Sequence, residues 1–109
     1  MNSKEIEKII AERLESIRPD KAILFGSFAY GQPGEDSDID LIVVLNKRGF
    51  PQSYNEKMEN YRLIRRLFRD INEVVPLDII VYTIDEWNSF IATGSSFSLQ
   101  ILEKGKAIA

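Results

Sequence analysis

Two aspartates at alternate positions of an apolar segment are the residues best suited to chemistry in this chain. Asp38 and Asp40 flank Ile39, and an apolar run over 41–45 follows them. Side chains alternate between the two faces of a β-strand, so both carboxylates should project from the same face. Carboxylates held this close repel each other unless a cation lies between them, and hard divalent cations prefer oxygen ligands. The spacing therefore predicts a metal site at the start of a buried strand.

A glycine and a serine precede this acidic pair by ten intervening residues. Gly26 and Ser27 follow the apolar run over 22–25, where a strand is expected to end. Glycine lets the backbone approach a phosphate closely, and Ser27 would offer a hydroxyl and an amide at a helix N-terminus. Taken alone, a simple strand-to-helix turn explains the two residues equally well.

A third carboxylate lies inside another apolar run. Asp78 stands between Leu77 and Ile79, in the segment Pro76 to Val81. An unpaired carboxylate inside such a strand is costly to bury, and a turn does not explain a residue in the middle of a strand. We therefore predict that Asp78 belongs to the same acidic site as Asp38 and Asp40.

Together these three features resemble the signature of the nucleotidyltransferase superfamily that includes DNA polymerase β. The short chain more narrowly resembles the minimal nucleotidyltransferases of prokaryotes, many of which are encoded beside a helical HEPN-type protein. The resemblance implies that Asp38, Asp40 and Asp78 bind two catalytic magnesium ions, and that Asp78 also helps to deprotonate the incoming hydroxyl. It further implies that Gly26 and Ser27 bind the triphosphate of ATP.

Two more positions bear on this resemblance. Ser37 precedes Asp38 and matches the usual Ser-Asp pair of the family, so it is a further candidate for nucleotide binding. The arginines that family members often carry after the serine are replaced here by Phe28 and Tyr30.

The resemblance implies transfer of AMP from ATP to a hydroxyl, such as a tyrosine of a HEPN-type toxin, with release of pyrophosphate. Two alternatives stay open. The chain could be a non-catalytic nucleotide-binding antitoxin that neutralises its partner by binding, or it could modify a small-molecule hydroxyl such as that of an antibiotic. The acceptor should come from another polypeptide, and a second copy of the chain, forming a homo-oligomer, could also complete the site.

The composition excludes several other kinds of site. The 109 residues include no histidine and no cysteine, which rules out Ser-His triads, typical zinc sites and a disulfide framework. A net charge of −3 argues against broad nucleic-acid binding. No apolar run approaches the roughly 18 residues of a membrane span, and no signal-peptide pattern begins the chain, so we expect a cytoplasmic protein. An EF-hand fails because Leu41 and Lys47 replace its glycine and glutamate.

Hydrophobic periodicity predicts a single domain over 1–109 of the α/β class. The expected architecture is a small mixed β-sheet with helices packed mainly on one face, as in the palm-like fold of the nucleotidyltransferases. The long link between the second and third strands favours a parallel pair, whereas the short link before Asp38 favours an antiparallel one. We expect helices over 3–18, 53–72, 83–92 and 95–104, a helical turn over 27–30, and strands over 22–25, 38–45, 77–82 and 106–109. The expected caps at the starts of the four helices are Asn2, Ser53, Thr83 and Ser95.

Four arginines of the long predicted helix have two interpretations. Arg62, Arg65, Arg66 and Arg69 lie away from its apolar side. They could form an ordinary solvated face, or they could form a docking surface for an acidic partner.

Overall fold

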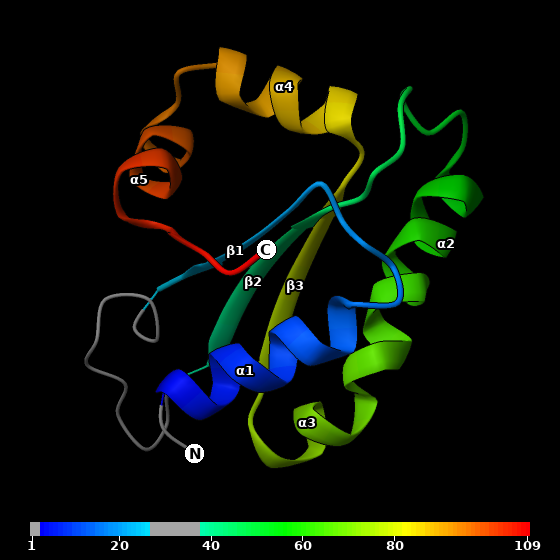
Figure 1. Cartoon of the computed structure of the whole chain (residues 1–109). Coiled ribbons are helices and arrows are strands. Elements are labelled where there is room, and N and C mark those ends of the chain that lie inside the picture. The colour runs from blue at the N-terminus through cyan, green and yellow to red at the C-terminus, as the bar shows by residue number, and fades with distance from the viewer. Residues whose placement is uncertain (1–2, 27–37) are drawn as a thin grey trace.

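Helices and strands alternate along the chain, as the periodicity predicts (Figure 1). The computed structural model describes residues 3–26 and 38–109. In chain order its elements are α1 (Ser3–Leu14), β1 (Lys21–Phe25), β2 (Ile39–Val44), α2 (Tyr54–Arg65), the 3-10 helix η1 (Arg66–Phe68), α3 (Arg69–Val74), β3 (Leu77–Tyr82), α4 (Ile84–Ala92), α5 (Ser96–Lys104) and β4 (Lys106–Ala107).

The described strands form one mixed sheet in the order β3-β2-β1-β4. β2 and β3 are parallel, and the crossover between them contains α2, η1 and α3. β1 pairs antiparallel with both β2 and β4. The predictions of a mixed sheet, a parallel pair and an antiparallel pair are all confirmed.

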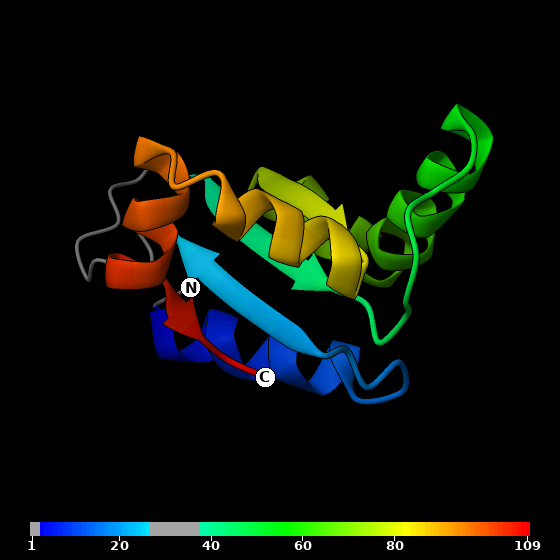
Figure 2. The same ribbon diagram turned by 90° about the horizontal axis from the view of Figure 1, so that it is seen from above.

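Helices lie on both faces of the sheet, with the larger share on one face, as predicted. Leu24, Leu41 and Val43 pack into a core with residues of α1, α2, η1 and α3. The alternate strand residues Ile23 and Ile42 pack with α4 and α5. Figure 2 shows α1 on one side of the sheet and both α4 and α5 on the other.

The long helix predicted over 53–72 is divided into three pieces, so the prediction of one continuous helix was wrong. The backbone leaves helical geometry at Phe68, where φ is −120° and ψ is 15°. Phe68 is only 1% exposed and packs in the core with Ile64 and Ile71. The tighter turn of η1 accompanies this burial of the large Phe68 ring between α2 and α3.

The ends of the helices follow the predicted capping residues in most cases. The backbone N–H of Glu56 donates to Ser53 at the start of α2, and Thr83 with Glu86 forms a complete capping box at α4. Ser95 caps α5. The predicted end of the first helix at residue 18 was wrong, because α1 ends at Leu14 and a turn follows it before the strand.

Asn2 and the predicted turn over 27–30 lie outside the described residues. In the part of the chain that is described, no helix has the length and apolar character needed to span a membrane.

We expect Phe68→Ala to lower the free energy of unfolding by about 3–5 kcal/mol, because it empties a core position between two helices. The measurement is urea unfolding followed by circular dichroism. Leu63→Ala is the control, since Leu63 lies five residues earlier on α2 and is 46% exposed; its cost should stay near 0.5 kcal/mol. Similar losses in the two variants would contradict the burial of Phe68.

Candidate active site

The register of the sheet places two of the predicted carboxylates side by side. Asp40 is paired with Asp78 across the parallel strands β2 and β3, and Phe25 is paired with Asp40 across β1 and β2. Paired residues on neighbouring strands project from the same face. Asp38 comes directly before β2, two residues from Asp40. Asp40 and Asp78 thus belong to the face that α4 and α5 partly cover.

Asp40 has the most perturbed electrostatic environment of the three. Its partial burial raises the pKa of the carboxyl above the usual value, and the negative charges of Asp78 and then Asp38 raise this pKa further. Asp38 and Asp78 are exposed, whereas Asp40 is half-buried between them. Asp40 is thus a neighbour of Asp78 across the two strands, and the charge of Asp38 also contributes to its pKa. We refer to these three residues as the acidic cluster.

The cluster fits a divalent cation in its chemistry. Carboxylate oxygens are the ligands that Mg²⁺ prefers, and a bound cation would relieve the repulsion around Asp40. As they stand, no three acidic side chains within residues 3–26 and 38–109 converge closely enough to hold a metal ion. Because Asp38 and Asp78 are exposed, their side chains have room to rotate toward Asp40. These three residues are therefore the ones that could hold magnesium.

Gly26 makes room for the central carboxylate. Its φ is +75°, a conformation that residues with a side chain rarely adopt, and an added Cβ would overlap Oδ2 of Asp40. The sequence suggested close approach of a phosphate as the reason for this glycine; the structure adds a second reason, the placement of Asp40. Ser27, Ser37, Phe28 and Tyr30 lie outside the described residues, so the predicted roles of the two serines stay predictions.

An aromatic border beside the acids was missed by the sequence analysis. Phe25 shares the cross-strand row of Asp40 and Asp78, and its ring meets that of Phe97 on α5 edge-on, with centroids 5.6 Å apart. Phe97 meets Phe90 of α4 at the same centroid distance. The alternation of Ile23 and Phe25 along β1 could have placed Phe25 on the face of the acids. Its contact with Phe97 could not be predicted in this way, because it joins segments far apart in the sequence.

The basic residues that follow β2 lie away from the acids. Lys47 and Arg48 come after the end of the strand opposite to Asp38 and Asp40. Lys47 Nζ is 3.9 Å from Glu56 Oε1, and Arg48 Nη1 is 3.7 Å from Asp85 Oδ1. These pairs favour a surface role for both cations over contact with phosphates at the acidic cluster.

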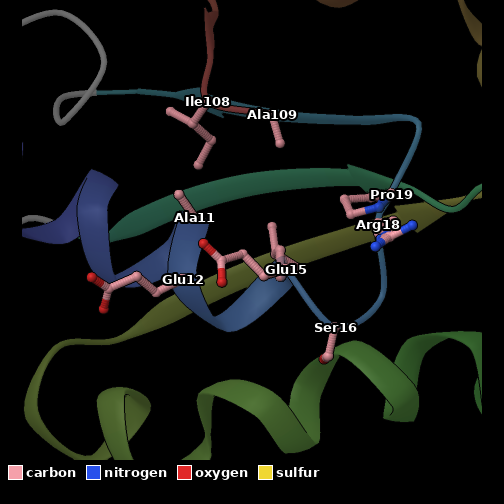
Figure 3. A pocket seen from close by; sticks show the side chains of 9 residues that line it. Ala11, Glu12, Glu15, Ser16, Arg18, Pro19, Ile108 and Ala109 are labelled. Carbon is pink, nitrogen blue, oxygen red and sulfur yellow. The ribbon is translucent and has the colours of Figure 1, made fainter.

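A wide hollow of 820 Å³ lies elsewhere, between the end of α1 and the last residues of the chain (Figure 3). Glu12, Glu15 and Arg18 line it beside Ile108 and Ala109. Of the predicted site residues that the structure describes, none borders this hollow. Its size alone therefore does not make it the reaction site, and the chemistry points to the acidic cluster.

Similarity to known proteins identifies the family of the chain. The model of the family described as "Nucleotidyltransferase domain" matches residues 3–107. A solved structure of a candidate nucleotidyltransferase from Sulfolobus solfataricus is similar with a TM-score of 0.57 and 23% identity, over 80% of this chain and 75% of that one. A structure described as a toxin–antitoxin with AMP-PNP is similar with a TM-score of 0.51 and 20% identity, over 94% of this chain and 72% of that one.

No curated protein matches the chain by sequence. The two solved structures share less than a quarter of their residues with this chain, so they establish the fold alone. The family match, in contrast, spans the elements that carry Asp38, Asp40 and Asp78. The chain belongs to the nucleotidyltransferase domain family.

Proposed function

We propose that the chain transfers AMP from ATP to a hydroxyl of a HEPN-type toxin partner, with Asp38, Asp40 and Asp78 as its catalytic residues. The observation that carries the proposal is the pairing of Asp40 with Asp78 across β2 and β3, with Asp38 nearby. Burial raises the pKa of Asp40, and the charges of Asp78 and Asp38 raise it further. Such a cluster is unfavourable for the folded protein alone and becomes favourable when a cation binds. The family match supplies the class of reaction.

In the proposed reaction Asp38 and Asp40 would hold magnesium beside the ATP phosphates, and Asp78 would complete the set of metal ligands. Bound magnesium would neutralise charge on the phosphates and align them for in-line displacement. The acceptor oxygen attacks the α-phosphorus, and the bond to the departing pyrophosphate breaks. Asp78, exposed on the edge strand β3, receives the proton of the acceptor hydroxyl. Gly26, Ser27 and Ser37 would bind the triphosphate beside these carboxylates.

The identity of donor and acceptor has separate support. AMP-PNP, named with one of the similar structures, is an analogue of ATP, and that structure is a toxin–antitoxin. These words describe the other protein, and they favour ATP and a toxin as the donor and partner proposed here. The absence of cysteine suits a reducing compartment such as the cytoplasm.

The direct test is incubation of the chain with ATP labelled at the α-phosphate, magnesium and the product of the adjacent gene. Label should appear on a tyrosine of that protein and should disappear with EDTA. Label that reaches only a small molecule would favour an antibiotic-type acceptor. Tight binding without any label would favour neutralisation by binding alone.

Asp40→Asn should abolish transfer while leaving the fold intact. Removing the charge of Asp40 should slow transfer about 100-fold or more, since charge neutralisation at such sites is worth several kcal/mol. Without metal, the variant should match or exceed the thermal stability of the wild type, because the lost charge was repelled by Asp78 and Asp38. Magnesium should raise the melting temperature of the wild type and have little effect on the variant.

The pH dependence of stability gives an independent check on the same residue. The pKa of folded Asp40 lies above its usual value, so the folded state binds the proton more tightly than the unfolded state. Stability from this group is therefore lost as the pH rises through the raised pKa. As the pH rises through this pKa, the stability of Asp40→Asn relative to the wild type should increase. Glu103→Gln, at an exposed position, should show no such increase. A difference independent of pH would contradict the repulsion.

Gly26→Ala should damage the site beyond its effect on the backbone. The substitution should cost about 1–2 kcal/mol of stability because φ is positive, and it should also lower transfer by displacing the Asp40 carboxylate. Gly94→Ala is the matched control, since Gly94 has a φ of +61° and nothing within 4 Å of an added Cβ. Equal activity of the two variants would contradict the role given to Gly26.

A further inference from the structure

A row of arginines covers the outward side of α2 and its continuation into α3. Arg62, Arg65, Arg66 and Arg69 line one hollow, and all four are exposed. In the part of the chain that the structure describes, none of the four forms an ion pair with an acidic side chain. We refer to these four residues as the arginine face.

The arginine face is hollowed rather than flat. A hollow of 350 Å³ is lined by the four arginines with Met58 and Tyr61, and no acidic residue lines it. A second hollow, of 370 Å³, lies on the other side of Arg62 and Arg66 and also contacts Leu63 and Glu59. Arg62 and Arg66 border both hollows and so form the ridge between them.

Two side chains in these hollows point to a ligand rich in oxygen acceptors. Tyr61 orients one arginine, because Arg65 Nη1 donates to the tyrosine oxygen at 3.2 Å. Asn60 lines the second hollow, is only 8% exposed, and its Nδ2 has no acceptor among the described residues. A buried donor without an acceptor is costly unless a ligand or water supplies one.

We infer that the arginine face docks an acidic surface of a partner protein, with carboxylates of a partner helix on Arg62 and Arg66. Residues four apart on a helix are about 6 Å apart along the axis, so carboxylates at the same spacing on a partner helix match the two guanidinium groups. Arginine, tyrosine and methionine are the side chains enriched at protein interfaces, and no lysine lines either hollow.

The same observations disfavour a nucleic acid as the occupant. The arginine face is about 10 Å long, which is enough for few phosphates, whereas binding through phosphates normally rests on several of them. Glu59 in the second hollow and the net charge of −3 would both repel an extended phosphate chain.

The arginine face also lies next to the strand that carries Asp78. Tyr61 and Arg65 line a small hollow with Leu77 and Ile79 of β3. Leu77 and Ile79 alternate with Asp78 and therefore project from the opposite face of this edge strand. In Figure 1 α2 stands at the border of the molecule beyond β3. That the docked protein also carries the acceptor hydroxyl rests on the proposed function.

Fluorescence anisotropy without nucleotide or magnesium tests the docking surface alone. The probe is a labelled helical peptide of about 20 residues with glutamates at i,i+4. The wild type should bind it, and binding should weaken with added salt. Arg62→Glu with Arg66→Glu should lower the affinity about tenfold or more, and Arg62→Lys with Arg66→Lys should fall between, since lysine keeps the charge but loses the bidentate geometry.

The matched control is Lys8→Glu with Lys104→Glu, the same change of charge at exposed positions away from both hollows. Its affinity should stay within about twofold of the wild type if attraction is local to the arginine face. Circular dichroism checks that each variant is folded. Absence of peptide binding, an equal loss in the control, or tighter binding of a single-stranded RNA of the same length would overturn the inference. Because no transfer is measured, failure of the proposed function would leave this result unchanged.

Discussion

Repulsion between carboxylates on an otherwise apolar sheet is the constraint around which this fold is arranged. The parallel register of β2 and β3 sets Asp40 against Asp78, and the adjacent row of the same face is made of Ile23, Ile42 and Ile80. Ile23, Ile42 and Ile80 pack against α4 and α5. Asp40 and Asp78 form the neighbouring row, which these helices cover only in part. Asp40 is therefore half-buried between two charges, which raises its pKa. Burial elsewhere in the sheet stabilises an arrangement that the acids alone would oppose.

Local signals in the sequence predicted those elements whose cause is itself local. Alternation of apolar residues located the strands, and Ser53 and Thr83 located the starts of two helices because a cap and its partner lie within one turn. Asp40 and Asp78 could be predicted to lie together because the long link between their strands favours a parallel pair. The break of the long helix at Phe68 was not foreseen, because it reflects how a large ring packs among residues from α1 and the sheet.

The part of the site that escaped sequence reasoning is the part built by distant contacts. Phe25 meets Phe97 only because β4 returns α5 to the edge of β1. Gly26 is a second example. Its position after a strand suggested a turn that approaches a phosphate, but the space beside it is filled by the carboxylate of Asp40 from the neighbouring strand. Residue type and spacing identify such positions as special, but the neighbour that makes them so depends on strand pairing.

The two charged regions of the molecule are related through one strand. β3 is an edge of the sheet; Asp78 projects from one face, and the residues on either side of it, Leu77 and Ile79, border the hollow that begins the arginine face. If the arginines and the carboxylates shared a face, they would attract each other and form ion pairs. The arginines would then neutralise the carboxylates in place of a metal ion. Because the two groups of charges lie on opposite faces of the sheet, none of the four arginines pairs with Asp78 among the described residues.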